Sequence, residues 1–143
     1  MRVLLDTATF LWWMTTPAEI PKRALEVLRD PDHEILLSVV TGWEIAIKRK
    51  LGRLVLPGRT STFLADAAAS HDLATLAVTM EHAVAAGELP LHHKDPFDRL
   101  LVAQAEIEQL VVATPDPAFR SYGVRTLWRR LPSAAVGRRR RPS

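Results

Sequence analysis

A chain of 143 residues is long enough for one compact domain with a single hydrophobic core. The absence of cysteine excludes disulfides, thiolate metal sites and a thiol nucleophile, so any bound metal must use oxygen or imidazole ligands. No uncharged apolar run reaches the roughly 18 to 20 residues of a membrane-spanning helix, and no cleavage-site pattern follows the N-terminal segment. We therefore expect a cytoplasmic protein that does not interact with membranes.

The formal charge of +3 is unevenly distributed along the chain. Residues 129–143 contain six Arg and no acid, whereas residues 1–128 contain 13 Lys and Arg against 16 Asp and Glu. Because Pro, Ser and Gly interrupt the basic segment, we predict a disordered C-terminal tail whose Arg residues could attract phosphate backbones. The alternative is a solubilising end or a cloning remnant. The domain itself, residues 1–128, is mildly acidic.

Short apolar runs alternate with helical patterns from the N-terminus onward. The predicted strands are residues 2–5, 34–37, 73–78 and 110–113, with 124–128 as a candidate fifth. The predicted helices are residues 8–14, 21–29, 39–51, 62–70, 80–86 and 96–109. Alternation of this kind indicates right-handed βαβ units. The fold class is therefore α/β, with a mostly parallel sheet of four to five strands covered on both faces.

Three of the predicted helices begin at a recognisable N-cap: Ser38, Thr79 and Asp95, the last followed by Pro96 at the first helical position. In the helix after Ser38, apolar residues recur every four positions and predict its buried face. These residues are Val39, Trp43, Ile47 and Leu51. Glu44 lies one position off this apolar row.

Four acids lie where a predicted strand ends or in the first turns of a helix: Asp6, Glu44, Asp98 and Asp116. Ligands of open parallel sheets bind beyond the carboxyl ends of the strands, so these carboxylates could share one cleft. Two carboxylates about 4 Å apart repel by roughly 1 kcal/mol in water and about 4 at an effective dielectric of 20. Such a cluster needs a counter-charge, and oxygen ligation favours Mg²⁺ or Mn²⁺, ions that are common in phosphodiester hydrolysis.

Each acid also has a structural explanation. Asp98, at the third helical position, would interact with the helix dipole, and Glu44 could pair with Lys48 one turn later. Asp95 could pair with Arg99 in the same way. Asp6 is harder to explain structurally, because an acid directly after a buried strand must be solvated, capped or bound.

Histidine and tryptophan do not change this interpretation. We do not expect a histidine-based metal site, because adjacent residues such as His92 and His93 seldom ligate the same ion. Tryptophans 12, 13, 43 and 128 are interpreted as core or oligomer-interface anchors, with stacking on bases as the alternative. The adjacent pair on the first helix suggests self-association.

Four sequence blocks, taken together and in order, carry a family resemblance. They are LLDT at 4–7, SVV at 38–40 with WEIAIK at 43–48, HKDPFDRLLVAQA at 93–105, and TPDPAF at 114–119 with YGV at 122–124. Together they resemble PIN-domain proteins of the VapC toxin type, over residues 3–128.

The resemblance implies a PIN-like three-layer α/β/α domain at residues 1–128 and a Mg²⁺- or Mn²⁺-dependent ribonuclease, the toxin of a type II toxin–antitoxin pair. The implied partners are an RNA substrate and a cognate VapB-like antitoxin, and we expect a homodimer. Carried over by position, the catalytic acids would be Asp6, Glu44, Asp98 and Asp116, with Asp95 and Thr114 as accessory residues. The direct metal ligands would be Asp6, Asp98 and Asp116.

Two other functions are compatible with the sequence. An acidic cleft could receive an Arg-bearing peptide in a non-catalytic protein-binding module, and metal-dependent cleavage would discriminate between this module and a nuclease. A phosphatase with Asp6 as nucleophile is less well supported, because position 8, where the second acid of an Asp-x-Asp pair would stand, is Ala. Proteins of the VapC type often have His at this position, so the chain departs from the family pattern at Ala8.

Overall fold

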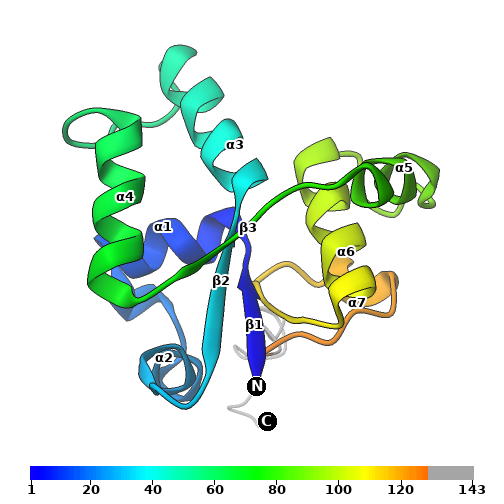
Figure 1. The fold of residues 1–143 in the computed structure, drawn as a ribbon, viewed down its shortest axis with the longest axis horizontal. Coiled ribbons are helices and arrows are strands. Elements are labelled where there is room, and N and C mark those ends of the chain that lie inside the picture. The colour runs from blue at the N-terminus through cyan, green and yellow to red at the C-terminus, as the bar shows by residue number, and fades with distance from the viewer. Residues whose placement is uncertain (129–143) are drawn as a thin grey trace, which may run out of the picture.

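Four parallel strands form the centre of the fold (Figure 1): β1 (Arg2–Leu5), β2 (Glu34–Ser38), β3 (Ala74–Leu76) and β4 (Val111–Ala113). In the computed structural model, which describes residues 1–128, their order is β3-β2-β1-β4. Val3 of β1 pairs with Ile35 on one side and with Val111 on the other. Because β1 is flanked by strands and covered on both faces, three of its four residues are fully buried, which explains its uninterrupted apolar run.

The helices and strands alternate along the chain as predicted. The helices of the described residues are α1 (Thr7–Thr15), α2 (Lys22–Arg29), α3 (Val39–Lys50), α4 (Thr60–His71), α5 (Met80–Glu88), α6 (Pro96–Glu108) and α7 (Ala118–Ser121), with a short 3-10 helix at Pro17–Glu19. Ser38, Thr79 and Asp95 cap α3, α5 and α6 through side-chain hydrogen bonds, so these three predictions are confirmed.

Each face of the sheet has its own hydrophobic core. Helices α1, α2 and α4 cover one face, where Phe10 and Trp13 pack with Val3 and Leu5 (Figure 1). Helices α6 and α7 cover the other face, where their side chains pack on Leu4 and its neighbours, and α5 packs on α6. Alternate residues of β1 enter opposite cores, as the strand period requires. The three-layer α/β/α prediction is confirmed.

The candidate fifth strand at residues 124–128 is wrong for the part of the chain that the structure describes. Only an isolated parallel bridge joins Val112 to Thr126, held by hydrogen bonds on either side of it. The preceding residues form the short helix α7 and a turn at Gly123, whose φ of +82° suits glycine. The predicted disordered tail, residues 129–143, lies outside the described residues.

The predicted buried face of α3 is also wrong. Val39, Trp43 and Leu51 are 49%, 60% and 60% exposed. The buried face consists instead of Val40, Thr41, Glu44 and Ile45. Two of these four side chains are polar, so a search for apolar periodicity selects the wrong side of the helix. Glu44 therefore lies on the buried face, not beside it.

The Trp12–Trp13 pair is not an exposed surface. Trp13 is 4% exposed, and Trp12 is partly buried against the core between the sheet and helices α1, α2 and α4. Trp128 packs against the same core, which leaves Trp43 as the exposed tryptophan of the described residues. None of the helices in residues 1–128 has the length and apolar character needed to cross a bilayer.

Candidate active site

The acid cluster, defined as Asp6, Glu44, Asp98 and Asp116, gathers around the carboxyl ends of β1, β2 and β4. Asp6 follows β1 directly and caps α1: its Oδ1 accepts the Thr9 N–H at 2.8 Å. Its Oδ2 accepts the Thr114 hydroxyl at 2.6 Å. Burial raises the pKa of Asp6 despite these hydrogen bonds, and the charge of Asp116 adds to the rise. The Asp6 carboxyl group is thus buried, caps α1 and lies next to a second acid.

Thr114 connects two of the predicted site residues. It follows β4, the neighbour of β1, and its Oγ1 donates to Asp6 while accepting the Asp116 N–H at 3.0 Å. The Asp116 Oδ1 accepts the Ala118 N–H at 2.9 Å, which orients its carboxylate at the start of α7. The parallel sheet therefore brings Asp6, Thr114 and Asp116 together, although more than a hundred residues separate Asp6 from the other two.

Asp98 comes to the cluster from the start of α6. Asp95 caps this helix by accepting the Phe97 N–H at 2.8 Å, and Asp98 is its third residue, as predicted. The pKa of Asp98 is raised from 3.8 to about 7, first by burial and then by the charges of Asp95, Asp6 and Glu44, while His93 opposes the rise. Asp98 therefore experiences the surplus of negative charge that the four acids create.

Glu44 is 3% exposed and enters the cluster from α3. Its Oε1 accepts the Thr7 hydroxyl at 2.7 Å, and its Oε2 contacts Lys48 Nζ. The predicted Glu44–Lys48 pair is confirmed, so this acid has a counter-charge of its own. The predicted Asp95–Arg99 pair is wrong: the Arg99 guanidinium donates to the carbonyl oxygens of His93 and Lys94.

His93 is the residue of this site that the sequence analysis missed. Its Nε2 lies 2.9 Å from Asp98 Oδ2 and 2.8 Å from Asp116 Oδ2, so one ring nitrogen bridges two acids of the cluster. His92, by contrast, packs edge-on against Tyr122, with ring centroids 4.9 Å apart. The available signal was the sequence block 93–105, which begins with His93 and includes Asp95 and Asp98.

The donor atoms at this site fit a divalent cation. A ring nitrogen of His93 and one carboxylate oxygen each of Asp98 and Asp116 lie within 4.8 Å of one another. Asp6 is connected to Asp116 through Thr114, so a third carboxylate is next to this group. Carboxylate oxygens in a partly buried and negatively charged setting are ligands that Mg²⁺ and Mn²⁺ prefer.

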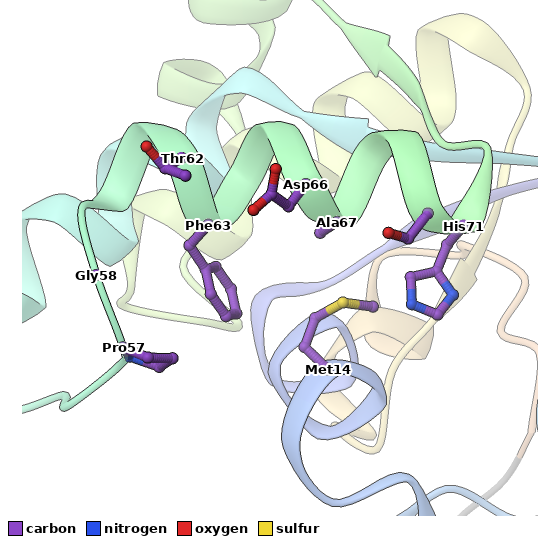
Figure 2. Close-up of a pocket in the computed structure, with 9 residues that line it drawn as sticks. Met14, Pro57, Gly58, Thr62, Phe63, Asp66, Ala67 and His71 are labelled. Atoms are coloured by element: carbon purple, nitrogen blue, oxygen red, sulfur yellow. The ribbon is translucent and has the colours of Figure 1, made fainter.

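The cavity of about 390 Å³ between α1 and α4 belongs to a different region (Figure 2). Met14 lines it from α1, and Phe63, Asp66 and His71 line it from α4. None of the four acids lines this cavity, whose walls mix apolar side chains with polar ones and contain a single carboxylate, that of the exposed Asp66. The candidate site is therefore defined by the carboxyl ends of the strands and not by this cavity.

The sequence matches the family model for the PIN domain over residues 3–124. The chain belongs to the PIN-domain family. This match covers every residue of the acid cluster and all four strands except Arg2, the first residue of β1. The predicted family and fold are thereby confirmed.

Solved structures with similar folds have low sequence identity to this PIN-domain chain. A chain of VapBC2 from Rickettsia felis, bound to a DNA fragment from its promoter, has a TM-score of 0.66 and 16% identity, covering 90% of this chain and 98% of that chain. VapBC-5 from Mycobacterium tuberculosis has a TM-score of 0.54 and 22% identity, covering 91% of this chain and 98% of that chain. FitAcB from Neisseria gonorrhoeae has a TM-score of 0.54 and 21% identity, covering 87% of this chain and 95% of that chain. The sequence has no significant match among curated proteins.

Proposed function

We propose that this PIN-domain protein is a divalent-metal-dependent ribonuclease that acts as the toxin of a VapC-type toxin–antitoxin pair. The observation that carries the proposal is the convergence of acids from β1, β4 and α6, with Glu44 of α3 beside them. Like charges at this density are stable only when a proton or a cation offsets them. The pKa of Asp98 is raised to about 7 in the metal-free protein, first by burial and then by the charges of Asp95, Asp6 and Glu44.

In this proposal Asp6, Asp98 and Asp116 hold Mg²⁺ or Mn²⁺. The bound ion would lower the pKa of a water molecule and offset charge on the scissile phosphate. Thr114 fixes the rotamer of Asp6, and Asp95 fixes the first turn of α6 and with it the position of Asp98. Glu44 contributes negative charge next to Asp98, and its contacts with Thr7 and Lys48 hold its carboxylate in place.

The proposed partners are RNA and a VapB-like antitoxin in the cytoplasm. Among the similar solved structures, VapBC-5 is a member of the VapBC family of toxin–antitoxin systems, which supports an antitoxin partner. We also propose self-association through the exposed apolar residues Val39, Trp43 and Leu51 of α3 and its C-terminal end. The six Arg of residues 129–143 would add salt-dependent attraction to RNA.

The test is cleavage of single-stranded RNA by the purified full-length protein, with Mg²⁺, with Mn²⁺ and with excess EDTA. We expect cleavage with either ion, none with EDTA, and none from Asp98→Asn in any condition. Asp66→Asn, a matched change at an exposed carboxylate of α4, should cleave like the wild type. Binding of an Arg-rich peptide to the acid cluster without any metal-dependent cleavage would favour the protein-binding module instead.

A further inference from the structure

The contacts of His93 differ from those expected of a metal-ligating histidine. Its Nε2 lies within hydrogen-bond distance of two carboxylates at once, at 2.9 Å from Asp98 and 2.8 Å from Asp116. Both carboxylates are proposed metal ligands that come from different elements, α6 and the segment after β4. A hydrogen on Nε2 would therefore hold together two like charges that otherwise repel.

The other ring nitrogen shows which atom carries that hydrogen. His93 Nδ1 lies 3.2 Å from the Asp95 backbone N–H, which can only donate, so Nδ1 must be the acceptor. In a neutral ring with Nδ1 as acceptor, the hydrogen is on Nε2. Nε2 is then a donor to Asp98 and Asp116 and presents no lone pair to a metal ion.

The backbone of His93 is fixed independently of the acids. Its N–H donates to the Tyr122 hydroxyl at 2.9 Å, and this hydroxyl donates to Pro90 O at 2.7 Å. Its carbonyl oxygen accepts from Arg99 of α6 at 3.2 Å. The backbone of His93 is thus fixed by Arg99 of α6 and by Tyr122, which directly follows α7, before any cation arrives, as preorganisation of a ligand set requires.

We propose that His93 is a positioning residue that holds Asp98 and Asp116 in ligating geometry through its Nε2–H and is not itself a metal ligand. The inference rests on the proposed function, because it assumes that these two carboxylates bind the ion. A carboxylate oxygen has lone pairs for both a hydrogen bond and a metal bond, so the same contacts can persist when the ion is bound.

The experiment measures Mn²⁺ affinity of the full-length protein by the EPR signal of free Mn²⁺. Hydrogen-bond partners of metal ligands typically contribute about 10- to 100-fold to metal affinity, so His93→Ala should weaken Mn²⁺ binding by about that factor. His93→Gln retains an N–H donor at similar reach and should recover most of the loss. His92→Ala, a matched change of the adjacent histidine that packs edge-on against Tyr122, should bind Mn²⁺ like the wild type.

A second measurement separates positioning from ligation without any variant. Pulsed EPR of the Mn²⁺-loaded wild type should show no hyperfine coupling of the size that a directly bound imidazole nitrogen gives. A strong nitrogen coupling would overturn the inference and make His93 a ligand. Unchanged or tighter Mn²⁺ binding by His93→Ala would also overturn it, while leaving the proposed ribonuclease function intact if the wild type still binds Mn²⁺ and cleaves RNA. A wild type that binds no Mn²⁺ would overturn both proposals.

Discussion

Two polar clusters in this protein differ in how their charges and hydrogen bonds are matched. The Gln104 cluster, defined as Ser38, His82, Gln104 and Glu108, joins β2, α5 and α6. Ser38 donates to Gln104 Oε1 at 2.6 Å, Gln104 Nε2 donates to the carbonyl oxygen of Ala77, and His82 Nε2 meets Glu108 at 2.9 Å. Three of its members are almost fully buried and all of them have partners.

The acid cluster has the opposite character. It brings four carboxylates together, with Lys48 and His93 as the basic side chains in contact with them in the described residues. Buried polar groups that are mutually satisfied typically stabilise a fold, whereas a surplus of one charge costs stability and marks a place where a ligand completes the structure. The Gln104 cluster, whose polar groups are satisfied, therefore holds the helices together, whereas the acid cluster, with its surplus of negative charge, is the one that we propose binds metal.

Asp98→Asn is expected to have the largest effect, because it removes a proposed ligand from the acid cluster. We expect RNA cleavage to fall at least about a thousandfold, since a lost transition-state contribution of about 4 kcal/mol corresponds to that factor. The metal-free protein should be equally or more stable, because the variant removes one of four like charges. Cleavage assays together with thermal unfolding in EDTA check both parts. A variant that cleaves normally but melts at lower temperature would assign Asp98 to the helix dipole alone.

The same variant gives a prediction with a defined pH dependence. The pKa of Asp98 is about 7 in the folded protein, against a reference value of 3.8 for an unperturbed aspartate, which we take for the unfolded chain. Between these two pH values the folded protein therefore binds more protons than the unfolded chain. Stability of the metal-free wild type should therefore fall as pH rises from about 4 to 7. The gain in melting temperature from Asp98→Asn should be near zero at pH 4 and largest above pH 7. A gain that is independent of pH would contradict the raised pKa.

Gln104→Ala should have the next largest effect and should act on stability. It leaves the buried Ser38 hydroxyl without its acceptor, which typically costs about 1 to 3 kcal/mol, and it leaves a cavity where the fully buried Gln104 side chain lay. We expect a loss of about 2 to 4 kcal/mol in the free energy of unfolding by urea titration, with unchanged Mn²⁺ affinity of the folded protein. Glu106→Ala, at an exposed position of the same helix, is the control. A change in metal affinity would show that the two clusters are coupled.

The difference between the clusters also explains what the sequence could predict. Apolar runs, caps and helix starts are local signals, so the strands, the Ser38 and Asp95 caps and the order of the layers were predictable. The acids after β1 and β4 were predictable from topology, because parallel strands place their carboxyl ends at one edge. The family resemblance added Asp95 and Thr114 as accessory site residues.

The remaining features depend on which side chains meet in three dimensions. The buried face of α3 contains Thr41 and Glu44, whose polar atoms have partners in Thr7 and Lys48, and no apolar period reveals this. His93 lies on an irregular segment. Its position depends on a hydrogen bond to Tyr122, which is 29 residues away in the sequence, and on another from Arg99 of α6. The prediction of a fifth strand at residues 124–128 is wrong for a related reason: one bridge to Val112 satisfies the backbone there without forming a strand.

Thr114→Val tests the connection inside the acid cluster and should have a smaller effect. It removes the donor to Asp6 and the acceptor of the Asp116 N–H. A hydrogen bond to a charged group contributes roughly 1.5 to 3 kcal/mol, so we expect a loss of that order above the pKa of Asp6 and a smaller loss as pH falls and Asp6 becomes protonated. Thr114→Ser retains the hydroxyl and is the control. Equal losses at all pH values would mean that packing alone is responsible.

Trp43→Ser should have the smallest effect on folding, because the side chain is 60% exposed. We expect a loss of about 0.5 to 1.5 kcal/mol in the free energy of unfolding, because the variant removes the edge-to-face contact between Trp43 and Phe97, whose ring centroids lie 5.2 Å apart. Self-association, measured by light scattering across a concentration series, should weaken if the exposed apolar residues of α3 form the contact between copies. An unchanged mass at every concentration would place the contact elsewhere, and a monomeric wild type would remove the homodimer.

The most direct test of the acid cluster as a metal site is anomalous diffraction from crystals grown with Mn²⁺. We expect an anomalous peak within about 2.5 Å of carboxylate oxygens of Asp6, Asp98 and Asp116, a distance that includes the usual range for metal–oxygen bonds. The peak should be absent from Asp98→Asn crystals grown in the same way. Four carboxylates in the geometry described above with no peak between them, or a peak bound only elsewhere on the protein, would contradict the proposed metal site.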